Sequence, residues 1–327
     1  MIARSSMVLL LLLGLKLEAQ AFDCGKASTE VELAICADSE LKAADDALGK
    51  AYSSLKPLLP AGEQKMLVRS QRRWIAWREG CGQSENGLAA CIREETAKRL
   101  RLFTGAPVSG PGTGNRPIPV FVIQEGNSKA YDLDVQLLRF DKPNSPGEKT
   151  LNRITREAAS LLKLGGHGED TGGATYAIIQ DMVLSFASTG FMSVRSYYWT
   201  DTGGAHGNGG VSNFNIGMAS GRLLAIEDFF SEDAAAGLAA SCRQQLIAEK
   251  RRRLGGEPYD PAADDFLKDE IIAEHIASMS RWSFAAGKAS VSFDPYAIGS
   301  YAEGQYDCIY PMDDLKDIAL DNAPLPQ

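Results

Sequence analysis

The sequence predicts a multi-domain fold: a small disulfide-linked all-α helical domain, followed by an α+β domain with an antiparallel sheet and helices on one side. Helical periodicity and capping motifs fill residues 22–104, and strand-like runs begin only beyond a stretch rich in Gly and Pro. Six cysteines divide into four early and two late. We therefore expect a signal peptide (1–21), a helical domain (22–104), a linker (105–128) and an α+β domain (129–327).

The first residues have the pattern of a secretory signal peptide. Arg4 supplies a positive charge, Met7 to Leu15 form an apolar core, and Ala19-Gln20-Ala21 is a small-x-small cleavage site. The apolar run is too short to span a bilayer. We expect cleavage before Phe22 and a periplasmic or secreted protein without a membrane span.

The predicted first domain carries helix start and stop signals. Thr29-x-x-Glu32 is a capping box at the start of a short helix. Asp38 or Ser39 can cap a longer helix that ends before Pro57. A second long helix is expected to end at Gly80, and a third to run from about Leu88 to Phe103.

Cysteine number and position favour disulfides, since an even count in an exported chain argues against metal or redox chemistry. Each domain is expected to close its own bonds. Four cysteines allow three pairings. If the second long helix returns antiparallel to the first, Cys81 ends near Cys36, which leaves Cys24 for Cys91. The six predicted disulfide cysteines are Cys24, Cys36, Cys81, Cys91, Cys242 and Cys308.

The stretch 105–119 lacks apolar periodicity and is interpreted as a linker. The pattern beyond it is mixed. Strands are expected at 133–140, 176–186, 191–199 and 211–216, with short ones near Trp282 and Val291. Helices are expected at 151–164, 234–254 and 264–279.

The charge of the chain limits its partners. A formal net charge of −8 makes general binding to nucleic acid or anionic lipid unfavourable and suits a basic partner. The run from Lys250 to Arg253 is interpreted as a solvated helix end that complements the helix dipole.

The sequence offers few residues that could form a catalytic site. Of the three histidines, His275 lies in an apolar helix and His167 in a Gly-rich loop, while His206 follows Asp201 in a second Gly-rich loop. These residues supply too few ligands for a metal site, and no activated Ser or Cys nucleophile accompanies them. We expect no enzyme activity, no cofactor and no metal.

Aromatic loops are the better candidates for a binding site. Tyr198 leads into the loop that holds His206, and residues 293–304 place two tyrosines on a loop containing Pro and Gly. Tyrosine offers a large contact area with few rotatable bonds. The competing interpretation is that these rings cap the core of the sheet. The predicted partner-binding residues are Tyr198, His206, Pro295, Tyr296, Ser300, Tyr301 and Glu303.

Residues 22–103 resemble the N-terminal domain of the LprI-type lysozyme inhibitors. The resemblance implies a helical four-cysteine domain that binds lysozyme. It rests on Phe22-Asp23-Cys24, Glu32-x-x-Ile35-Cys36-x-Asp38-x-Glu40-Leu41, Ala44-Asp45, Tyr52, Gln71-x-x-Trp74, Arg78-x-x-Cys81 and Cys91.

Residues 131–318 look like the extracytoplasmic domain of the anti-sigma factor RsiV, a lysozyme receptor. This domain type also accompanies polysaccharide deacetylases, and the present chain lacks the receptor's transmembrane helix. The similar residues are Tyr197-Tyr198, Gly203-Gly204-Ala205-His206, Phe214-Asn215, Gly221-x-Leu223-Leu224, Asp228-x-Phe230, and Pro295-Tyr296-x-Ile298-Gly299-x-Tyr301-Ala302-x-Gly304.

Together these features predict an exported envelope protein that binds, and inhibits, lysozyme or a related peptidoglycan hydrolase. Two alternatives of other classes stay open. One is a peptidoglycan-binding or glycan-binding module accessory to a wall-modifying enzyme, and the other is a hydrolase that uses His206 with Asp201.

Overall fold

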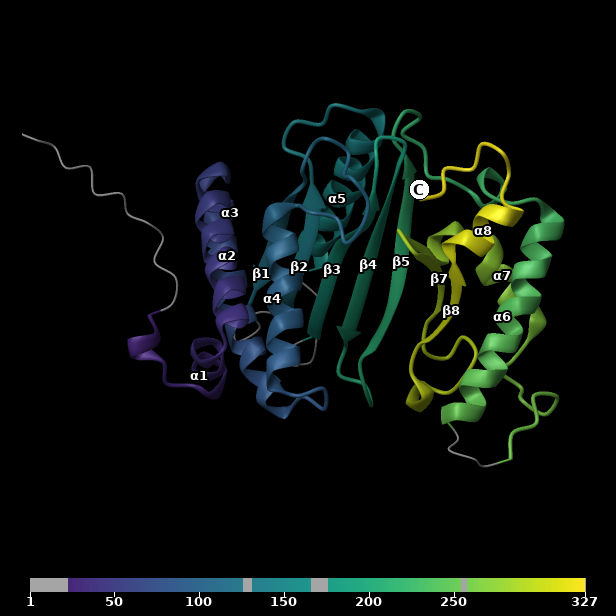
Figure 1. Ribbon diagram of the computed structural model, residues 1–327, viewed down its shortest axis with the longest axis horizontal. Coiled ribbons are helices and arrows are strands. Elements are labelled where there is room, and N and C mark those ends of the chain that lie inside the picture. The colour runs from purple at the N-terminus through teal and green to yellow at the C-terminus, as the bar shows by residue number, and fades with distance from the viewer. Residues whose placement is uncertain (1–22, 126–130, 166–175, 254–257, 327) are drawn as a thin grey trace, which may run out of the picture.

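The computed structural model describes residues 23–125, 131–165, 176–253 and 258–326, and the predicted signal peptide lies outside them. Figure 1 shows a group of helices, then a five-stranded sheet, then a smaller sheet flanked by further helices. The expected order of a helical region and an α+β region is therefore confirmed. Within the described ranges, no helix is long and apolar enough to cross a membrane.

The helical region begins at the predicted caps. Thr29 accepts a hydrogen bond from the N–H of Glu32, whose carboxylate accepts one from the N–H of Thr29, so the predicted capping box is present. Asp38 caps the next helix by accepting from the N–H of Glu40 at 2.8 Å. The helices are α1 (Glu30–Ala37), α2 (Ser39–Leu55), α3 (Ala61–Arg78) and α4 (Leu88–Thr104).

The disulfides of the helical region differ from the expected pairing. Cys24 bonds Cys36, and Cys81 bonds Cys91. Cys81 does lie near α1, in one apolar cluster with Ile35. Its sulfur nevertheless reaches the first turn of α4, since the short 3-10 helix after α3 turns the chain back within ten residues. The preference for Cys36 with Cys81 was therefore wrong.

The larger sheet is mixed rather than antiparallel throughout. Its strands are ordered β1-β2-β3-β4-β5, and only β2 and β3 run parallel. Helix α5 (Pro146–Gly165) connects these two strands, and parallel neighbours require such a crossover. The strands are β1 (Ile118–Gln124), β2 (Tyr131–Arg139), β3 (Tyr176–Ala187), β4 (Phe191–Asp201) and β5 (Asn208–Gly217).

Helices cover both faces of this sheet: α5 of the α+β region packs on one face, and α4 of the helical region packs on the other. Successive side chains of a strand point to opposite faces. On β2, Leu137 packs in one apolar cluster with Leu151 of α5, whereas Gln136 accepts a hydrogen bond from Arg99 of α4 at 2.7 Å. Figure 1 accordingly shows α4 in front of the strands and α5 behind them.

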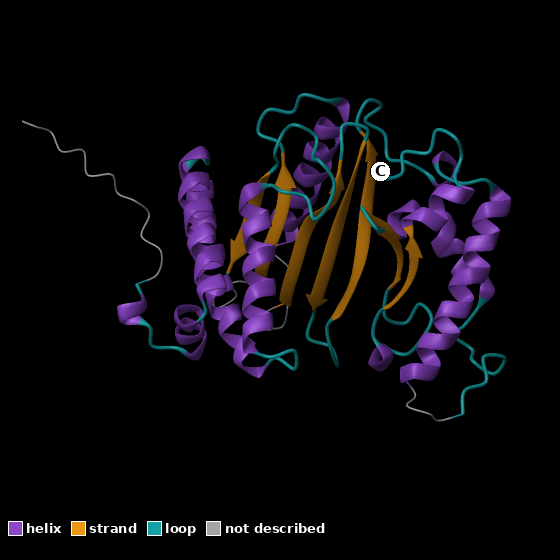
Figure 2. Cartoon of the chain, in the orientation of Figure 1, coloured by secondary structure: helices purple, strands orange, loops and turns teal. Residues whose placement is uncertain are grey.

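The smaller sheet has the order β6-β7-β8. Its strands are β6 (Trp282–Ala285), β7 (Lys288–Phe293) and β8 (Tyr306–Pro311), and β8 was not predicted. The disulfide between Cys242 and Cys308 joins β8 to the neighbouring helix. Figure 2 shows the helices gathered on the outer side of this sheet: α6 (Glu232–Arg253), α7 (Asp269–Ala277) and α8 (Met312–Ile318).

The range 105–128, predicted as a linker, is structured where it is described. Val108 donates its N–H to the carbonyl of Leu184 at 2.8 Å, and residues 118–124 form β1. Phe121 and Ile123 of β1 belong to the same apolar cluster as Leu48 and Phe103 of the helices. The two regions thus share a core.

Charged side chains strengthen this junction. Arg139 of β2 forms a two-pronged ion pair with Glu63 of α3, and Arg73 of α3 donates to Asp132 at 2.7 Å. Arg99 is buried between the two regions and donates to Ser70, Gln71 and Gln136. The helical region and the sheet therefore present surfaces that are fixed relative to each other.

Candidate functional site

Two loops that are distant in sequence meet at one end of the two sheets. The β4–β5 loop carries His206, and the β7–β8 loop carries Tyr296 and Tyr301. The Nε2 atom of His206 lies 3.1 Å from the hydroxyl of Tyr296, and its ring stacks on Tyr301 with centroids 3.7 Å apart. We call these three residues the His–Tyr cluster.

The Tyr296 backbone shows how firmly the cluster is held. Among the described residues, Tyr296 alone is a non-glycine with positive φ, at 73°, and 52% of it is exposed. This conformation is unfavourable for an L-residue with a large side chain, so surrounding contacts must maintain it. An exposed ring held in this way is suited to contact with a partner.

Asp294, in the β7–β8 loop, ties that loop to strand β5. It accepts a hydrogen bond from the N–H of Val211 at 2.8 Å and pairs with Arg281 at 2.6 Å. Its carboxyl group lies where a Cβ on Gly210 would be, only 2.6 Å away. A side chain at position 210 would therefore push the β7–β8 loop away from β5, and the glycine is required for this close approach.

Glu303 and Ser300 stabilise the tyrosine loop from within. The N–H of Ser300 donates to Glu303 at 2.6 Å, and Tyr306 and Lys250 donate to the same carboxylate. Burial alone would raise the pKa of Glu303, but these hydrogen bonds outweigh it and lower the pKa. Glu303 is therefore ionised and part-buried, and the structure gives it an anchoring role in the loop.

Tyr197 is part of the motif similar to RsiV but is not among the predicted partner-binding residues. It is 41% exposed, and burial, the charge of Asp181 and the nearby Tyr301 raise its pKa. Strand alternation places Tyr198, one of the predicted residues, on the opposite face of β4. The alternation of side chains along a strand predicts that Tyr197 and Tyr198 lie on opposite faces of the sheet. The sequence does not show which of these faces meets the loop that carries Tyr296 and Tyr301.

Asp181 extends the site along β3, where it lies opposite Tyr197 in the register. Burial and the negative charge of Asp134 raise the pKa of Asp181 to about 6, despite the opposing effect of Arg99. A part-buried carboxyl group that ionises at about pH 6 therefore lies next to Tyr197 on β3.

The arrangement around His206 suits recognition better than acid–base catalysis. Its Nδ1 lies 2.9 Å from the carbonyl oxygen of Gly207, and its Nε2 faces Tyr296. Asp201, the partner required by the hydrolase alternative, accepts from the N–H of Gly203 in the turn. In the part of the chain that the structure describes, no group of three His, Cys, Asp or Glu side chains could hold a metal ion.

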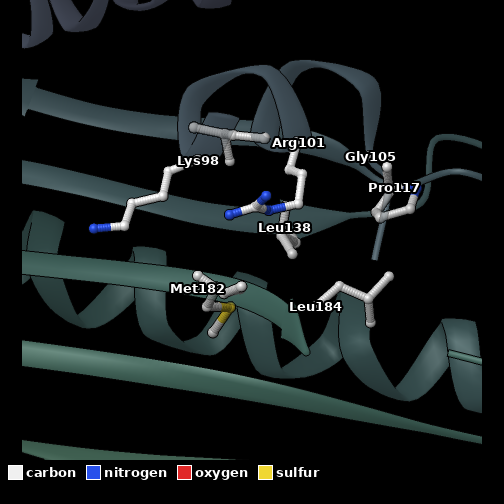
Figure 3. A pocket seen from close by; sticks show the side chains of 10 residues that line it. Lys98, Arg101, Gly105, Pro117, Leu138, Met182 and Leu184 are labelled. Carbon is white, nitrogen blue, oxygen red and sulfur yellow. The ribbon is translucent and has the colours of Figure 1, made fainter. Parts of the chain in front are cut away.

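A crevice between α4 and the sheet is too small to bind an organic ligand. Figure 3 shows Lys98 and Arg101 of α4 beside it, with Leu138 of β2 and Leu184 of β3. Its volume is about 50 Å³, well below the roughly 150 Å³ of a cavity that holds benzene. The predicted site residues do not line it.

The helical region is similar to known proteins. Residues 23–102 match the family described as "Lysozyme inhibitor LprI". An uncharacterised protein of Rhizobium meliloti (strain 1021) is 30% identical over 101 residues, which cover 24% of this chain and 73% of that protein.

Two solved structures of the DUF3298 family are similar to a larger part of the chain. One, from Bacteroides fragilis NCTC 9343, has 17% identity and a TM-score of 0.41 and covers 64% of this chain and 93% of its own. The other, from Pseudomonas aeruginosa PAO1, has 14% identity and a TM-score of 0.44, with coverage of 65% and 96%.

Proposed function

We propose, from the premise that residues 23–102 belong to the LprI lysozyme inhibitor family, that this protein binds and inhibits a lysozyme-type glycosidase. The protein acts after export, in the periplasm or outside the cell, and has no catalytic activity of its own. Its His–Tyr cluster, together with Tyr197, contacts the enzyme beside the substrate cleft.

The observation that carries this proposal is the meeting of the two loops in an exposed aromatic cluster. His206 and Tyr296 are 90 positions apart yet in hydrogen-bonding contact. Aromatic side chains held rigidly at a surface lose little conformational entropy on binding, which is typical of interface hot spots. The acidic chain favours a basic enzyme, since opposite charges speed association.

The resemblance of the C-terminal region to the lysozyme-binding domain of RsiV supports the same class of target. The motifs of that resemblance include His206, Tyr296 and Tyr301, the three residues of the cluster. The function proposed for the LprI-like helices and the function proposed for the α+β region therefore agree, although each is inferred separately.

The test is titration of the oxidised mature protein into a lysozyme assay on cell walls, with calorimetry at several salt concentrations. We expect stoichiometric inhibition that weakens as salt increases. Substitutions Tyr296→Ala and Tyr301→Ala should each weaken binding by about tenfold, a common cost for a hot-spot aromatic. Absence of both heat and inhibition with several lysozyme types would reject the proposal, and retention on purified peptidoglycan would then favour the glycan-binding alternative.

Tyr198→Ala is the matched control for Tyr296→Ala. Tyr198 is an exposed tyrosine too, but it lies on β4, on the face opposite Tyr197. On the proposed geometry its removal leaves affinity unchanged. A loss of affinity there, with none on Tyr296→Ala, would move the contact to the opposite face of the sheet.

A further inference from the structure

The β7–β8 loop needs support from outside its own backbone to hold Tyr301 in place. The hydrogen bond from the N–H of Gly304 to the carbonyl of Tyr301 closes a local turn only. Ile298 anchors the first half of the loop in an apolar core cluster, to which none of residues 300–305 belongs. The second half of the loop, which carries Tyr301, is supported instead by the last turn of α6.

Arg253 joins α6 to this second half of the loop. Its guanidinium donates to the backbone carbonyls of Glu303 and Gln305, the latter at 2.9 Å. It also lies over the ring of Tyr306, 3.8 Å from the centroid. A guanidinium is planar, presents its donors in a fixed fork and stacks on aromatic rings, so it is suited to holding two carbonyls and a ring together.

Two neighbours on α6 complete the support. Lys250 is only 4% exposed and lies 2.8 Å from Asp264 and 3.2 Å from Glu303. Glu249 pairs with Arg253 at 2.7 Å. Lys250 therefore holds the carboxylate of Glu303, while Arg253 holds the backbone carbonyl of the same residue.

The basic run 250–253, interpreted from the sequence as a solvated helix end, divides into two kinds of residue. Arg251 and Arg252 are exposed, and Arg252 pairs with Glu249 of its own helix. The side chain of Arg252 is 72% exposed, whereas that of Arg253 is 28% exposed. The interpretation was wrong for Lys250, which is buried, and it leaves out the contacts of Arg253 with the loop.

We propose that Arg253 is a positioning residue, which holds Tyr301 in its stack on His206 so that the His–Tyr cluster can bind the partner. The centroids of these two rings lie 3.7 Å apart. Arg253 fixes the backbone that follows Tyr301, and the Glu303 carboxylate fixes the backbone before it by accepting from the N–H of Ser300 at 2.6 Å. The inference rests on the proposed function, to which it adds a residue that acts without touching the partner.

Arg253→Ala removes the contacts with the loop, and Arg252→Ala is the matched control. Each substitution removes a positive charge and an ion pair with Glu249 from the same helix turn. Their effects on the helix dipole and on long-range attraction of a basic enzyme should therefore be equal. We expect both variants to fold, since neither side chain belongs to the apolar core cluster beside α6.

Nuclear magnetic resonance of the full-length mature protein observes the cluster without lysozyme. Ring protons of His206 above the face of Tyr301 resonate at lower frequency because of the ring current. His206→Gln identifies these signals, and Tyr301→Ala gives their position without the stack. We expect Arg253→Ala to move them toward that position and Arg252→Ala to leave them in place. Unmoved signals in Arg253→Ala would overturn the proposal.

Calorimetry with lysozyme gives the second readout. We expect Arg253→Ala to weaken binding by about fivefold, the usual cost of one well-formed hydrogen bond, and Arg252→Ala to leave it unchanged. In a protein that already carries Tyr301→Ala, Arg253→Ala should have no further effect, because it acts through that ring. An equal loss with and without Tyr301 would overturn the proposal, since Arg253 would then act on binding by another route.

The two readouts separate the failures. Signals of His206 that move in Arg253→Ala, in a protein that binds no lysozyme, reject the proposed function and leave the positioning of Tyr301 standing. Lysozyme binding that depends on Tyr301, with Arg253→Ala and Arg252→Ala alike in both readouts, overturns the positioning role alone.

Discussion

Substitutions of Tyr296 can distinguish an effect on stability from an effect on binding, because its backbone has a positive φ. Its φ of 73° favours glycine, because glycine lacks the Cβ that makes this region unfavourable. We expect Tyr296→Gly to be more stable than Tyr296→Ala by about 1 kcal/mol, while both lose the ring and weaken lysozyme binding. Urea unfolding of the two variants measures the difference. A more stable alanine variant would contradict the strain argument.

Asp181 should make the stability of the protein depend on pH between about 4 and 6. Its pKa is raised to about 6 in the folded protein. Between pH 4 and 6 the unfolded chain loses this proton first, so the free energy of unfolding falls as pH rises through that window. The shift corresponds to at most about 3 kcal/mol.

Asp181→Asn should therefore stabilise the protein at pH 7.5 and have a smaller or opposite effect at pH 4. Urea unfolding at both pH values measures this. Asp265→Asn is the control, since Asp265 is exposed. Equal effects of Asp181→Asn at the two pH values would show that the pKa of Asp181 is not raised in the folded protein.

At the scale of elements, the disulfides contribute unequally. The bond between Cys242 and Cys308 spans 66 positions and fastens α6 to β8, whereas that between Cys24 and Cys36 spans 12. Loop-closure entropy predicts losses of about 4 and about 3 kcal/mol when each pair is replaced by alanine. Unfolding of the two double variants in urea gives the comparison, and a larger loss for the shorter loop would contradict the entropic account.

The elements that escaped prediction have definite physical causes. Residues 118–124 were predicted as part of a linker, because Pro117 and Pro119 disfavour a strand. The structure places β1 at the edge of the sheet, paired only with β2, where a proline is tolerated. The parallel pairing of β2 with β3 follows from α5, which connects them. It could have been predicted from the helix expected at 151–164, because a helix between two neighbouring strands allows them to run parallel.

The candidate site was predictable only in its parts. The sequence marked the loops of His206 and of Tyr296 and Tyr301, since both combine aromatic residues with glycine. The contact between them is tertiary, and it depends on Asp294 fitting against Gly210.

At the scale of the whole molecule, the packed junction predicts joint unfolding. The helices and β1 share one apolar cluster, and Arg99 bridges α3, α4 and β2. We expect a single transition in which tryptophan fluorescence and far-ultraviolet circular dichroism coincide. Arg99→Ala leaves polar partners buried and unpaired, so it should lower the midpoint and split the transition. Two transitions in the unaltered protein would show that the junction is weak.

The order of the disulfides along the chain has a consequence for biogenesis. Every bond joins a cysteine to the next one in sequence: first to second, third to fourth, fifth to sixth. A polypeptide that crosses a membrane N-terminus first presents its thiols in that order, so an oxidase acting on each consecutive pair as it emerges makes the native bonds. Such a protein has little need of a disulfide isomerase, and its yield should be the same in export-competent cells that lack one.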